Sequence, residues 1–380
     1  MKNVRYILST MCNGGGVESF FENAATQLMQ AGWTVELVVL GRYDNDLVQH
    51  HRARGIAVRC FTDSTKKDTF FSLLFHYSAL KRFLGAEPAR ITHINTCSHS
   101  VVIVLHCLKA LGCRARILHS HTSPAKNLKL LRRFRYAVVR QYALKTATKM
   151  VACSKSAAYF LFPRKQIETG HVMILSNGID LERFAFDASR RAVQREKLGK
   201  GDAWIIGTVG RLEEEKNLEY LLHCFAAFQK VCSNALLLLV GEGSLHDELA
   251  KKARALGLEP RVILTGQVQN VEDYLCAMDL FVMPSRYEGM PMALLEAQCS
   301  GLPCVVSDGV PAEACRFGNV IQLAPKADCK VWADTFGEAV HMTQIRQEAF
   351  RNLIGVADVE TMGKALCALY EDDMDCERLH

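Results

Sequence analysis

The segment PSRYEGMPMALLEA, residues 284–297, carries the clearest information about the fold. It follows Leu280–Met283, an apolar run of strand length, and Pro291 suits the first turn of a helix. The segment therefore predicts a strand, a polar loop and a helix in succession. Glu288 falls in the loop and Glu296 falls more than one turn inside the helix, so one element presents two carboxylates.

The loop before this predicted helix offers groups that suit a nucleotide sugar. The backbone N–H groups of Gly289 and Met290 lie between the two carboxylates and are expected to point into the same crevice. In open parallel sheets, ligands bind beyond the carboxyl ends of the strands. A nucleoside-diphosphate sugar carries sugar hydroxyls, phosphates and ribose hydroxyls. Glu288, the N–H groups and Glu296 would meet these groups in that order.

Short β-rich runs alternate with helical stretches along the chain, which predicts parallel sheets built from βαβ units. In the first half the predicted strands are Val4–Ser9, Thr34–Leu40, Ile91–Ile94, Ala115–His119, Met150–Ala152 and Val172–Leu175. In the second half they are Trp204–Val209, Ala235–Val240, Val262–Leu264, Leu280–Met283 and Cys304–Val306. The pattern predicts an α/β protein with two Rossmann-like domains, over residues 1–183 and 184–380. The last predicted helix, near residues 359–370, could pack on either domain.

Two further loops follow predicted strands and offer groups for an anion. Gly14-Gly15-Gly16 lets the backbone approach a ligand and leads into a helix whose first N–H groups carry partial positive charge. This loop lacks the G-x-G-x-x-G spacing and no acidic residue ends the next strand, which disfavours a nicotinamide dehydrogenase. Gly210-Arg211 and Lys216 place two cations after Trp204–Val209, where they could neutralise a diphosphate. A plain tight turn and a solvated charged loop are the structural alternatives.

Two histidines, His119 and His121, stand at the carboxyl end of the predicted strand Ala115–His119. Their place at a strand end favours a role in the ligand site. Ordinary structural hydrogen bonds would explain them equally well. The pair therefore gives a candidate site residue without deciding which histidine fills the role.

The segment SRYEGMPMALLEAQCSGLPCVVSD, residues 285–308, resembles the E-x7-E signature of family 4 retaining glycosyltransferases of GT-B fold, and is most similar to their bacterial exopolysaccharide and capsule group. GRLEEEKN, residues 210–217, resembles the family's G-R-x(4)-K-N segment. SNGID at 176–180 and GGGVE at 14–18 resemble its interdomain segment and its N-terminal glycine loop. The four matches fall in order along about residues 1–310. The resemblance implies two facing Rossmann-like domains with a cleft between them.

The resemblance also implies a role for each matching residue. Arg211 and Lys216 would hold the donor diphosphate and stabilise the leaving group. Glu288 would contact hydroxyls of the donor sugar, and Glu296 would bind the ribose. His121 would lie beside the transferred sugar, with His119 as the competing assignment. The remaining donor-site residues would be Gly15, Gly16, Gly210, Gly289, Met290 and Pro291. The family retains the anomeric configuration without a bound metal or another cofactor, and with no agreed protein nucleophile.

Composition and charge exclude several other classes. The fifteen cysteines include no C-x-x-C pair and no zinc-finger spacing, which indicates a reduced protein rather than a disulfide scaffold. We find no apolar run long enough for a signal peptide or a membrane-spanning helix. Asp44-Asn45-Asp46 fits the D-x-D pattern of a metal site, but it lies far from the donor block. We interpret it as a polar turn and expect no metal.

The charge is unevenly distributed. Residues 1–150 hold 22 Lys and Arg against 8 Asp and Glu, whereas residues 151–380 hold 24 against 32. The segment KNLKLLRRFRYAVVR, residues 126–140, has six basic residues and no acidic one, with an apolar stripe at helical spacing. It predicts a surface that docks on anionic lipid, with a solvated helix face as the alternative. No recognition helix or aromatic platform supports nucleic acid as the partner.

We therefore expect a cytoplasmic transferase, attached peripherally to the inner face of the plasma membrane. It would move a hexose from a nucleotide-diphosphate sugar, with UDP favoured, to a glycan or a polyprenyl-diphosphate-linked acceptor in surface polysaccharide biosynthesis. A sugar-nucleotide epimerase of the same fold and a non-catalytic partner subunit are the alternatives. The E-x7-E block disfavours the epimerase. The intact cations and carboxylates of the predicted donor site disfavour the non-catalytic subunit.

Overall fold

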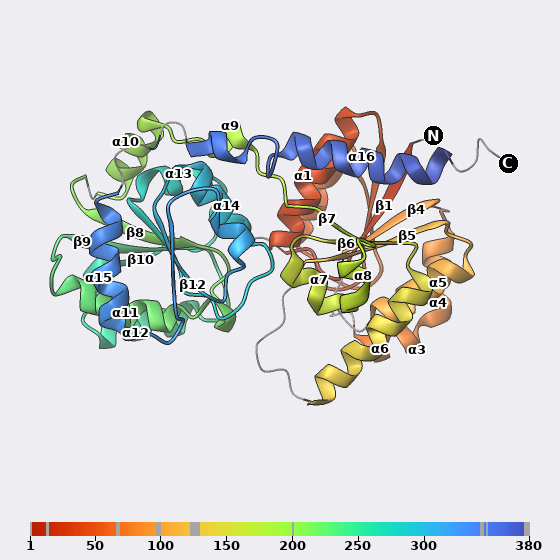
Figure 1. Cartoon of the computed structure of the whole chain (residues 1–380), viewed down its shortest axis with the longest axis horizontal. Coiled ribbons are helices and arrows are strands. Elements are labelled where there is room, and N and C mark those ends of the chain that lie inside the picture. The colour runs from red at the N-terminus through yellow and green to blue at the C-terminus, as the bar shows by residue number, and fades with distance from the viewer. Residues whose placement is uncertain are drawn as a thin grey trace. The chain divides into compact units, whose positions relative to one another are not determined.

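The computed structural model describes residues 2–12, 15–65, 69–87, 89–95, 100–121, 130–199, 201–342, 346 and 349–375, with only the backbone at 130–135, 340 and 373–375. The chain divides into two compact units (Figure 1). Unit 1 comprises Met1–Gly178 and Val359–His380, and unit 2 comprises Ile179–Asp358. The first unit therefore ends before the predicted boundary at residue 183. The last predicted helix, which the sequence allowed on either domain, belongs to unit 1.

Unit 1 contains a parallel sheet in the order β3-β2-β1-β4-β5-β6-β7. Its strands are β1 (Asn3–Leu8), β2 (Thr34–Val39), β3 (Ala57–Cys60), β4 (Ile91–Asn95), β5 (Ala115–Ser120), β6 (Lys149–Ala152) and β7 (Val172–Ile174). Leu8 is in register with Val39 on one side and with Asn95 on the other. The strand order reverses at β1, and such a switch point is where parallel α/β sheets bind ligands.

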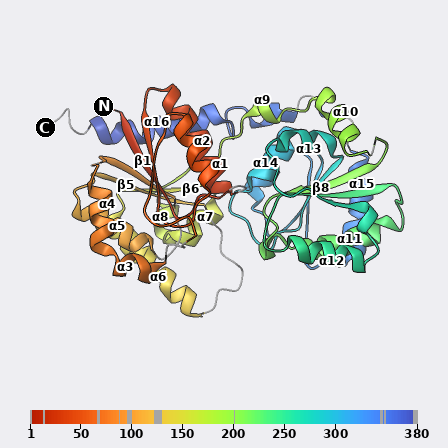
Figure 2. The same ribbon diagram turned by 180° about the vertical axis from the view of Figure 1, so that it is seen from behind.

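Helices cover both faces of this sheet (Figures 1 and 2). They are α1 (Gly16–Gln30), α2 (Asn45–Ala53), α3 (Phe70–Phe75), α4 (Tyr77–Gly85), α5 (Val101–Ala110), α6 (Leu130–Thr146), α7 (Lys155–Leu161), α8 (Arg164–Glu168) and α16 (Val359–Asp375). The last helix, α16, packs along α1. Met362, Leu366 and Tyr370 are buried in the core of unit 1, which explains why the C-terminal helix belongs to this unit.

Unit 2 contains a second parallel sheet, in the order β10-β9-β8-β11-β12-β13. Its strands are β8 (Trp204–Val209), β9 (Ala235–Val240), β10 (Val262–Leu264), β11 (Leu280–Met283), β12 (Cys304–Ser307) and β13 (Val320–Leu323). Its helices are α9 (Leu181–Phe184), α10 (Ala188–Lys197), α11 (Leu218–Gln229), α12 (His246–Ala255), α13 (Val271–Ala277), α14 (Met292–Cys299) and α15 (Cys329–Val340). Short 3₁₀ turns are η1 (Glu214–Lys216), η2 (Glu259–Arg261), η3 (Ala312–Cys315) and η4 (Ala349–Leu353). The strand order reverses at β8, beside β11.

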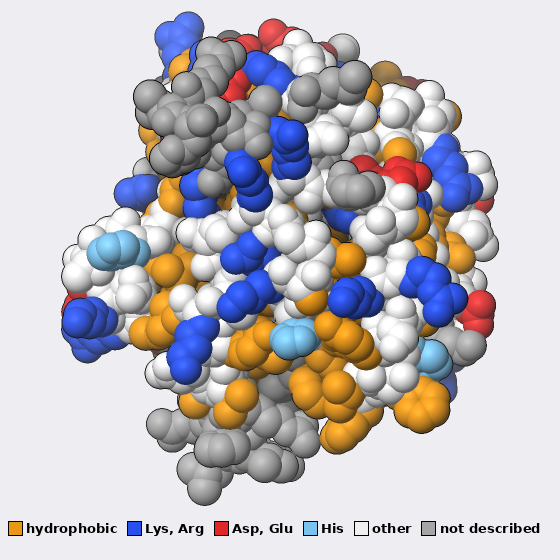
Figure 3. Space-filling model, turned by 90° about the vertical axis from the view of Figure 1, so that its right-hand side faces the viewer, with side chains coloured by type: hydrophobic (Ala, Val, Ile, Leu, Met, Phe, Trp, Pro, Cys, Tyr) orange, Lys and Arg blue, Asp and Glu red, His pale blue; other side chains and the backbone are white. Residues whose placement is uncertain are grey.

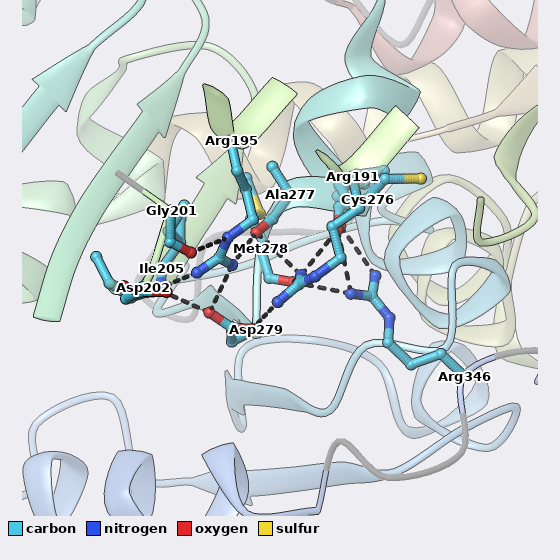
Figure 4. Close-up of polar contacts among 12 residues, drawn as sticks. Arg191, Arg195, Gly201, Asp202, Ile205, Cys276, Ala277, Met278, Asp279 and Arg346 are labelled. Atoms are coloured by element: carbon cyan, nitrogen blue, oxygen red, sulfur yellow. Dashed lines mark hydrogen bonds and ion pairs between the residues drawn. The ribbon is translucent and has the colours of Figure 1, made fainter. Parts of the chain in front are cut away.

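Three arginines of unit 2 form a network of hydrogen bonds around the start of β11 (Figure 4). Asp279 accepts hydrogen bonds from Arg191 at 2.5 Å and from Arg195 at 3.1 Å. Arg346 donates to the carbonyls of Leu275 and Met278, and burial lowers the pKa of its guanidinium to about 10. These bonds satisfy the carbonyls at the end of α13 and attach α10 to the strand that leads into the predicted donor loop.

Two general features concern the described residues as a whole. None of their helices combines the length and the apolar character needed to cross a bilayer. The cysteines among them are free thiols, many of them buried.

Candidate active site

The loop after β8 is held close to the sheet by glycines. Gly210 has a φ of 144°, a conformation that favours glycine, and a Cβ there would stand 3.8 Å from the Lys216 Nζ. A Cβ at Gly241 or Gly243 would overlap the backbone of Gly210 or Leu212. The β9–α12 loop therefore packs directly against the β8 loop.

Lys216 and Glu288 form an ion pair between two strand ends. Lys216 lies in η1 after β8, Glu288 lies after β11, and their Nζ and Oε1 atoms are 2.7 Å apart. The two side chains are 19% and 12% exposed, so water screens the pair less than it screens a surface pair. The structure thus brings together two residues that the sequence placed 72 positions apart.

Further bonds join the same two loops. The Arg286 N–H donates to the Glu215 carbonyl at 2.8 Å, and its guanidinium pairs with Glu214 at 2.6 Å. Asn217 has a φ of 57°, and its side-chain amide donates to the Pro284 carbonyl at 3.2 Å. These contacts hold the ion pair in place from both sides of the switch point.

A third loop supports the segment that carries Glu288. The Glu288 N–H donates to the Gly309 carbonyl at 3.0 Å. A Cβ at Gly309 would stand 2.5 Å from the Ser285 carbonyl oxygen, so this approach requires glycine. Sequence reasoning missed Gly309. The sequence signal for it is a glycine two residues after the end of β12.

The other predicted donor residues lie around this pair. Arg211 is about half exposed, and its guanidinium is 3.3 Å from Glu215 Oε1. Gly289 and Met290 precede Pro291, which is the N-cap of α14 rather than a residue of its first turn. The predicted helix position of Pro291 is therefore wrong by one residue, because the Pro291 backbone is extended, with a ψ of 111°.

Glu296 lies in α14 within a group of charges that the sequence did not reveal. Burial raises the pKa of its carboxyl to about 7, with a further increase from Glu272 and an opposing effect from Arg183. Arg183 also pairs with Glu272 at 3.0 Å. A carboxylate with this pKa changes its hydrogen-bonding capacity near neutral pH, because only the ionised form accepts on both oxygens.

The glycine loop of unit 1 already contains a carboxylate. Gly15 is the N-cap of α1 and Gly16 begins the helix. The Glu18 carboxylate folds over Gly15 and accepts from the Cys12 N–H at 3.2 Å, and a Cβ at Gly15 would overlap it. A phosphate at these N–H groups would compete with Glu18. Gly14 lies outside the described residues.

His119 lies in β5 near its carboxyl end and His121 follows the strand. Their ring centroids are 3.9 Å apart, with the ring planes tilted by 37°. Phe20 of α1 contacts both rings, at 4.9 Å and 4.8 Å. The His121 Nε2 is 2.7 Å from Asn95 Oδ1 at the end of β4. The His121 Nδ1, the His119 Nε2 and the Asn95 Nδ2 are buried and have no hydrogen-bond partner among the described residues, which do not include 96–99 or 122–129. Three unsatisfied polar atoms therefore gather beside the switch point of unit 1, where a ligand would complete their bonding.

A chain of buried hydrogen bonds leads away from His119. Its Nδ1 is 3.0 Å from His93 Nε2, and His93 Nδ1 is 2.6 Å from the hydroxyl of Tyr370 in α16. That hydroxyl is 2.6 Å from the Tyr6 hydroxyl. If Tyr370 donates to His93, then His93 donates to His119, and the His119 proton lies on Nε2. No local sequence pattern predicts this series of hydrogen bonds, because its members come from four separate elements.

These imidazoles are neutral near pH 7. Burial lowers the pKa of His93 and of His121 to about 3, and that of His119 well below its usual range. His119 is fully buried, whereas His121 is partly exposed. This difference favours His121 for direct contact with a ligand.

No group of three His, Cys, Asp or Glu residues that could hold a metal ion occurs among the residues with described positions. Asp44, from the D-x-D pattern, instead caps α2 and accepts from the Asp46 N–H at 2.8 Å. Residues 126–129 of the predicted lipid-docking segment lie outside the described residues, as do the side chains of 130–135.

Two parallel α/β sheets with polar loops at their switch points are the architecture of the GT-B fold. Residues 14–183 match the family model described as "Glycosyltransferase Family 4", and residues 203–341 match "Glycosyl transferases group 1". A putative glycosyltransferase, EpsF, of Bacillus subtilis is 34% identical over 272 residues, which are 70% of each chain. The chain belongs to glycosyltransferase family 4 and is a glycosyltransferase.

Two other proteins show what this chain is similar to. An Escherichia coli protein named UDP-Gal:alpha-D-GlcNAc-diphosphoundecaprenol alpha-1,3-galactosyltransferase is 27% identical over 68% of this chain and 66% of its own length. The crystal structure of Anabaena HepE in complex with UDP-glucose has a TM-score of 0.80 and 17% identity. The match covers 98% of this chain and 100% of HepE. The latter similarity concerns the fold.

Proposed function

We propose that this protein transfers a hexose, with retention of configuration, from a UDP-sugar to a polyprenyl-diphosphate-linked glycan in surface polysaccharide synthesis. The observation that carries the proposal is the Lys216–Glu288 ion pair at the carboxyl ends of β8 and β11. A switch point is where a parallel sheet binds its ligand, and this one presents a fixed ammonium.

The ion pair suits the departure of a nucleoside diphosphate. An ammonium has three N–H donors, so Lys216 can donate to Glu288 and still offer donors to phosphate oxygens. The pair therefore orients Lys216 before the donor arrives. As the bond to the sugar breaks, negative charge grows on the diphosphate, and fixed cations stabilise that charge. Arg211 supplies the second cation.

Glu288 is proposed to contact hydroxyls of the donor sugar through the oxygen that Lys216 leaves available. Glu296 is proposed to accept from the ribose hydroxyls. Neither carboxylate is proposed as a nucleophile, so retention would follow from attack by the acceptor on the face that the leaving group vacates. The cations would supply the charge stabilisation, and neither metal nor other cofactor is proposed.

The acceptor and the location rest on other observations. The Escherichia coli relative is named for a diphosphoundecaprenol-linked substrate, which supports an acceptor of that chemistry here. The basic residues of the first half suit such an anionic, membrane-borne substrate. We therefore propose a peripheral location on the cytoplasmic face of the membrane. His121, whose buried Nδ1 has no partner among the described residues, is proposed to contact the transferred sugar.

The direct test is product analysis with the full chain. The protein is incubated with UDP-glucose, UDP-galactose or UDP-N-acetylglucosamine, a polyprenyl-diphosphate-linked sugar and EDTA, and the new linkage is assigned by NMR. We expect release of UDP and an α-linkage from one donor. An inverted product would overturn retention, and loss of activity in EDTA would overturn the metal-free proposal. A donor isomerised without transfer would indicate the epimerase.

A further inference from the structure

The short helix α3 of unit 1 exposes a row of large apolar side chains. Phe71 is 74% exposed, Phe75 is 86% exposed and Leu74 is 51% exposed. These positions are spaced three and four residues apart, so they share one face of the helix, while Leu73 on another face is fully buried. Folding therefore leaves Phe71, Leu74 and Phe75 in water, although burial of each would be favourable.

The chain around α3 is strongly basic. Asp63 and Asp68 precede α3, but from residue 69 to residue 167 the sequence has seventeen Lys and Arg residues and a single acidic residue, Glu87. The helices α4 and α5 both contact α3. Each carries an exposed cation, Arg82 in α4 and Lys109 in α5. Figure 3 views this end of unit 1: hydrophobic side chains gather along the lower part of the face, and Lys and Arg side chains are spread over it.

We propose that α3 is a membrane wedge, which inserts Phe71, Leu74 and Phe75 into the interfacial region of an anionic bilayer while basic side chains of the same face bind lipid phosphates. Apolar side chains beside basic residues are the features of interfacial membrane helices. The proposal rests on the proposed membrane location and names the surface responsible for it. It assigns the insertion to α3, which lies outside the predicted docking segment at 126–140.

Charge and area favour a bilayer over a second copy of this chain. Two copies of a face with this excess of cations would repel each other. Three side chains also fall far short of the roughly 800 Å² per partner that a stable protein interface buries. An anionic bilayer satisfies both constraints, because it attracts the cations and accepts a small apolar wedge.

The test compares flotation of the full chain with phosphatidylcholine vesicles, with and without phosphatidylglycerol. Wild type is expected to float only with the anionic vesicles, and less so in high salt. The variant Phe71→Ser/Phe75→Ser is expected to bind these vesicles at least tenfold more weakly. The matched control is Val231→Ser in unit 2, which removes another side chain with 78% exposure and should change nothing.

A second variant reports insertion directly. Phe75→Trp places an indole on the wedge, and its fluorescence should be quenched by lipids brominated in their acyl chains, whereas the native tryptophans of wild type should not respond. Unchanged flotation of the double Ser variant, or no quenching in the Trp variant, would overturn the proposal. Concentration-dependent dimers that the Ser variant abolishes would instead assign α3 to a second copy.

Failure of the wedge can be separated from failure of the proposed function. Each variant is also tested for a UDP-induced increase in melting temperature, which depends on unit 2. Retained UDP binding with lost flotation is the expected pattern for the double Ser variant. If wild type shows no UDP-induced shift, the proposed donor is refuted, and the flotation result remains valid.

Discussion

The two switch points of this protein differ in their chemistry. In unit 2, the loops after β8 and β11 present charged side chains: Lys216 pairs with Glu288, and Arg211 lies near Glu215. In unit 1, the ends of β4 and β5 present neutral groups, His119, His121 and Asn95, several of whose buried polar atoms find no partner in the part of the chain that the structure describes. The same type of sheet thus presents fixed charge in one unit and neutral hydrogen-bonding groups in the other.

This difference indicates a division of labour. Fixed cations act on a group that gains negative charge during reaction, as a departing diphosphate does. Neutral imidazoles, with pKa values far below 7, neither gain nor lose a proton in the physiological range and so act through hydrogen bonds. The comparison predicts that variants in unit 2 affect turnover most, and that variants in the unit 1 hydrogen-bond chain affect stability.

The largest effect is expected for Lys216→Ala. Loss of the ammonium removes stabilisation of the leaving group, and kcat should fall by about 100- to 1000-fold. Steady-state UDP release measures the loss, and the melting temperature reports folding. Lys251→Ala, at an exposed position on α12, is the matched control. A Lys216→Ala enzyme with wild-type kcat would remove the diphosphate assignment.

A double-mutant cycle measures the coupling between Lys216 and Glu288 in unit 2. Glu288→Ala alone should lower kcat/KM by at least tenfold, because it leaves Lys216 unoriented and removes a contact to the sugar. Lys216→Ala/Glu288→Ala should lose much less than the sum of the two single effects, with a coupling of about 1–3 kcal/mol. Additive losses would show that the two side chains act separately.

Tyr370→Phe tests the neutral hydrogen-bonded groups of unit 1. The variant leaves His93 Nδ1 and the Tyr6 hydroxyl buried without a partner, so the free energy of unfolding should fall by about 1–3 kcal/mol. Denaturant titration measures the change, and the partly exposed Tyr159→Phe is the control. The ¹⁵N shifts of the histidines should also report a changed tautomer balance in His93 and His119. Unchanged stability and unchanged shifts would contradict the hydrogen-bond chain.

The smallest effect concerns Glu296 and pH. Its pKa in the folded protein, about 7, exceeds the ordinary value of 4.5, so the folded state holds the proton more tightly. Stability therefore decreases as pH rises from about 4.5 to about 7, and the full penalty applies above that range. Glu296→Gln should be more stable than wild type by about 1–3 kcal/mol at pH 8 and no more stable near pH 4.5. Glu248→Gln, on an exposed position of α12, is the control, and an advantage independent of pH would contradict the assignment.

The sequence predicted most strands because their cores are continuous apolar runs. Trp204–Val209, Ala235–Val240, Val262–Leu264 and Leu280–Met283 have the predicted bounds. The strands β3 and β13 were missed. Both lie at sheet edges, where a strand contacts fewer neighbours and carries polar residues such as Arg59 and Gln322.

The candidate site was predicted only where it follows strand ends. Local patterns located Lys216 and Glu288, since each lies in a loop directly after a strand, and the sheet order then brings the two loops together. Contacts between distant segments left no local signal. The hydrogen-bonded path from His119 to Tyr370 and the placement of Arg183 beside Glu296 each depend on tertiary packing.

The most direct test of the central claim is a thermal-shift titration of the full chain with UDP, GDP, ADP and uridine in EDTA. If the cations of unit 2 hold a diphosphate, one nucleoside diphosphate should stabilise the protein by about 2.7 kcal/mol at 100 times its Kd. Uridine at the same concentration should give little or no shift, because it lacks the diphosphate. Equal stabilisation by uridine and UDP, or no shift with any nucleotide, would contradict the account.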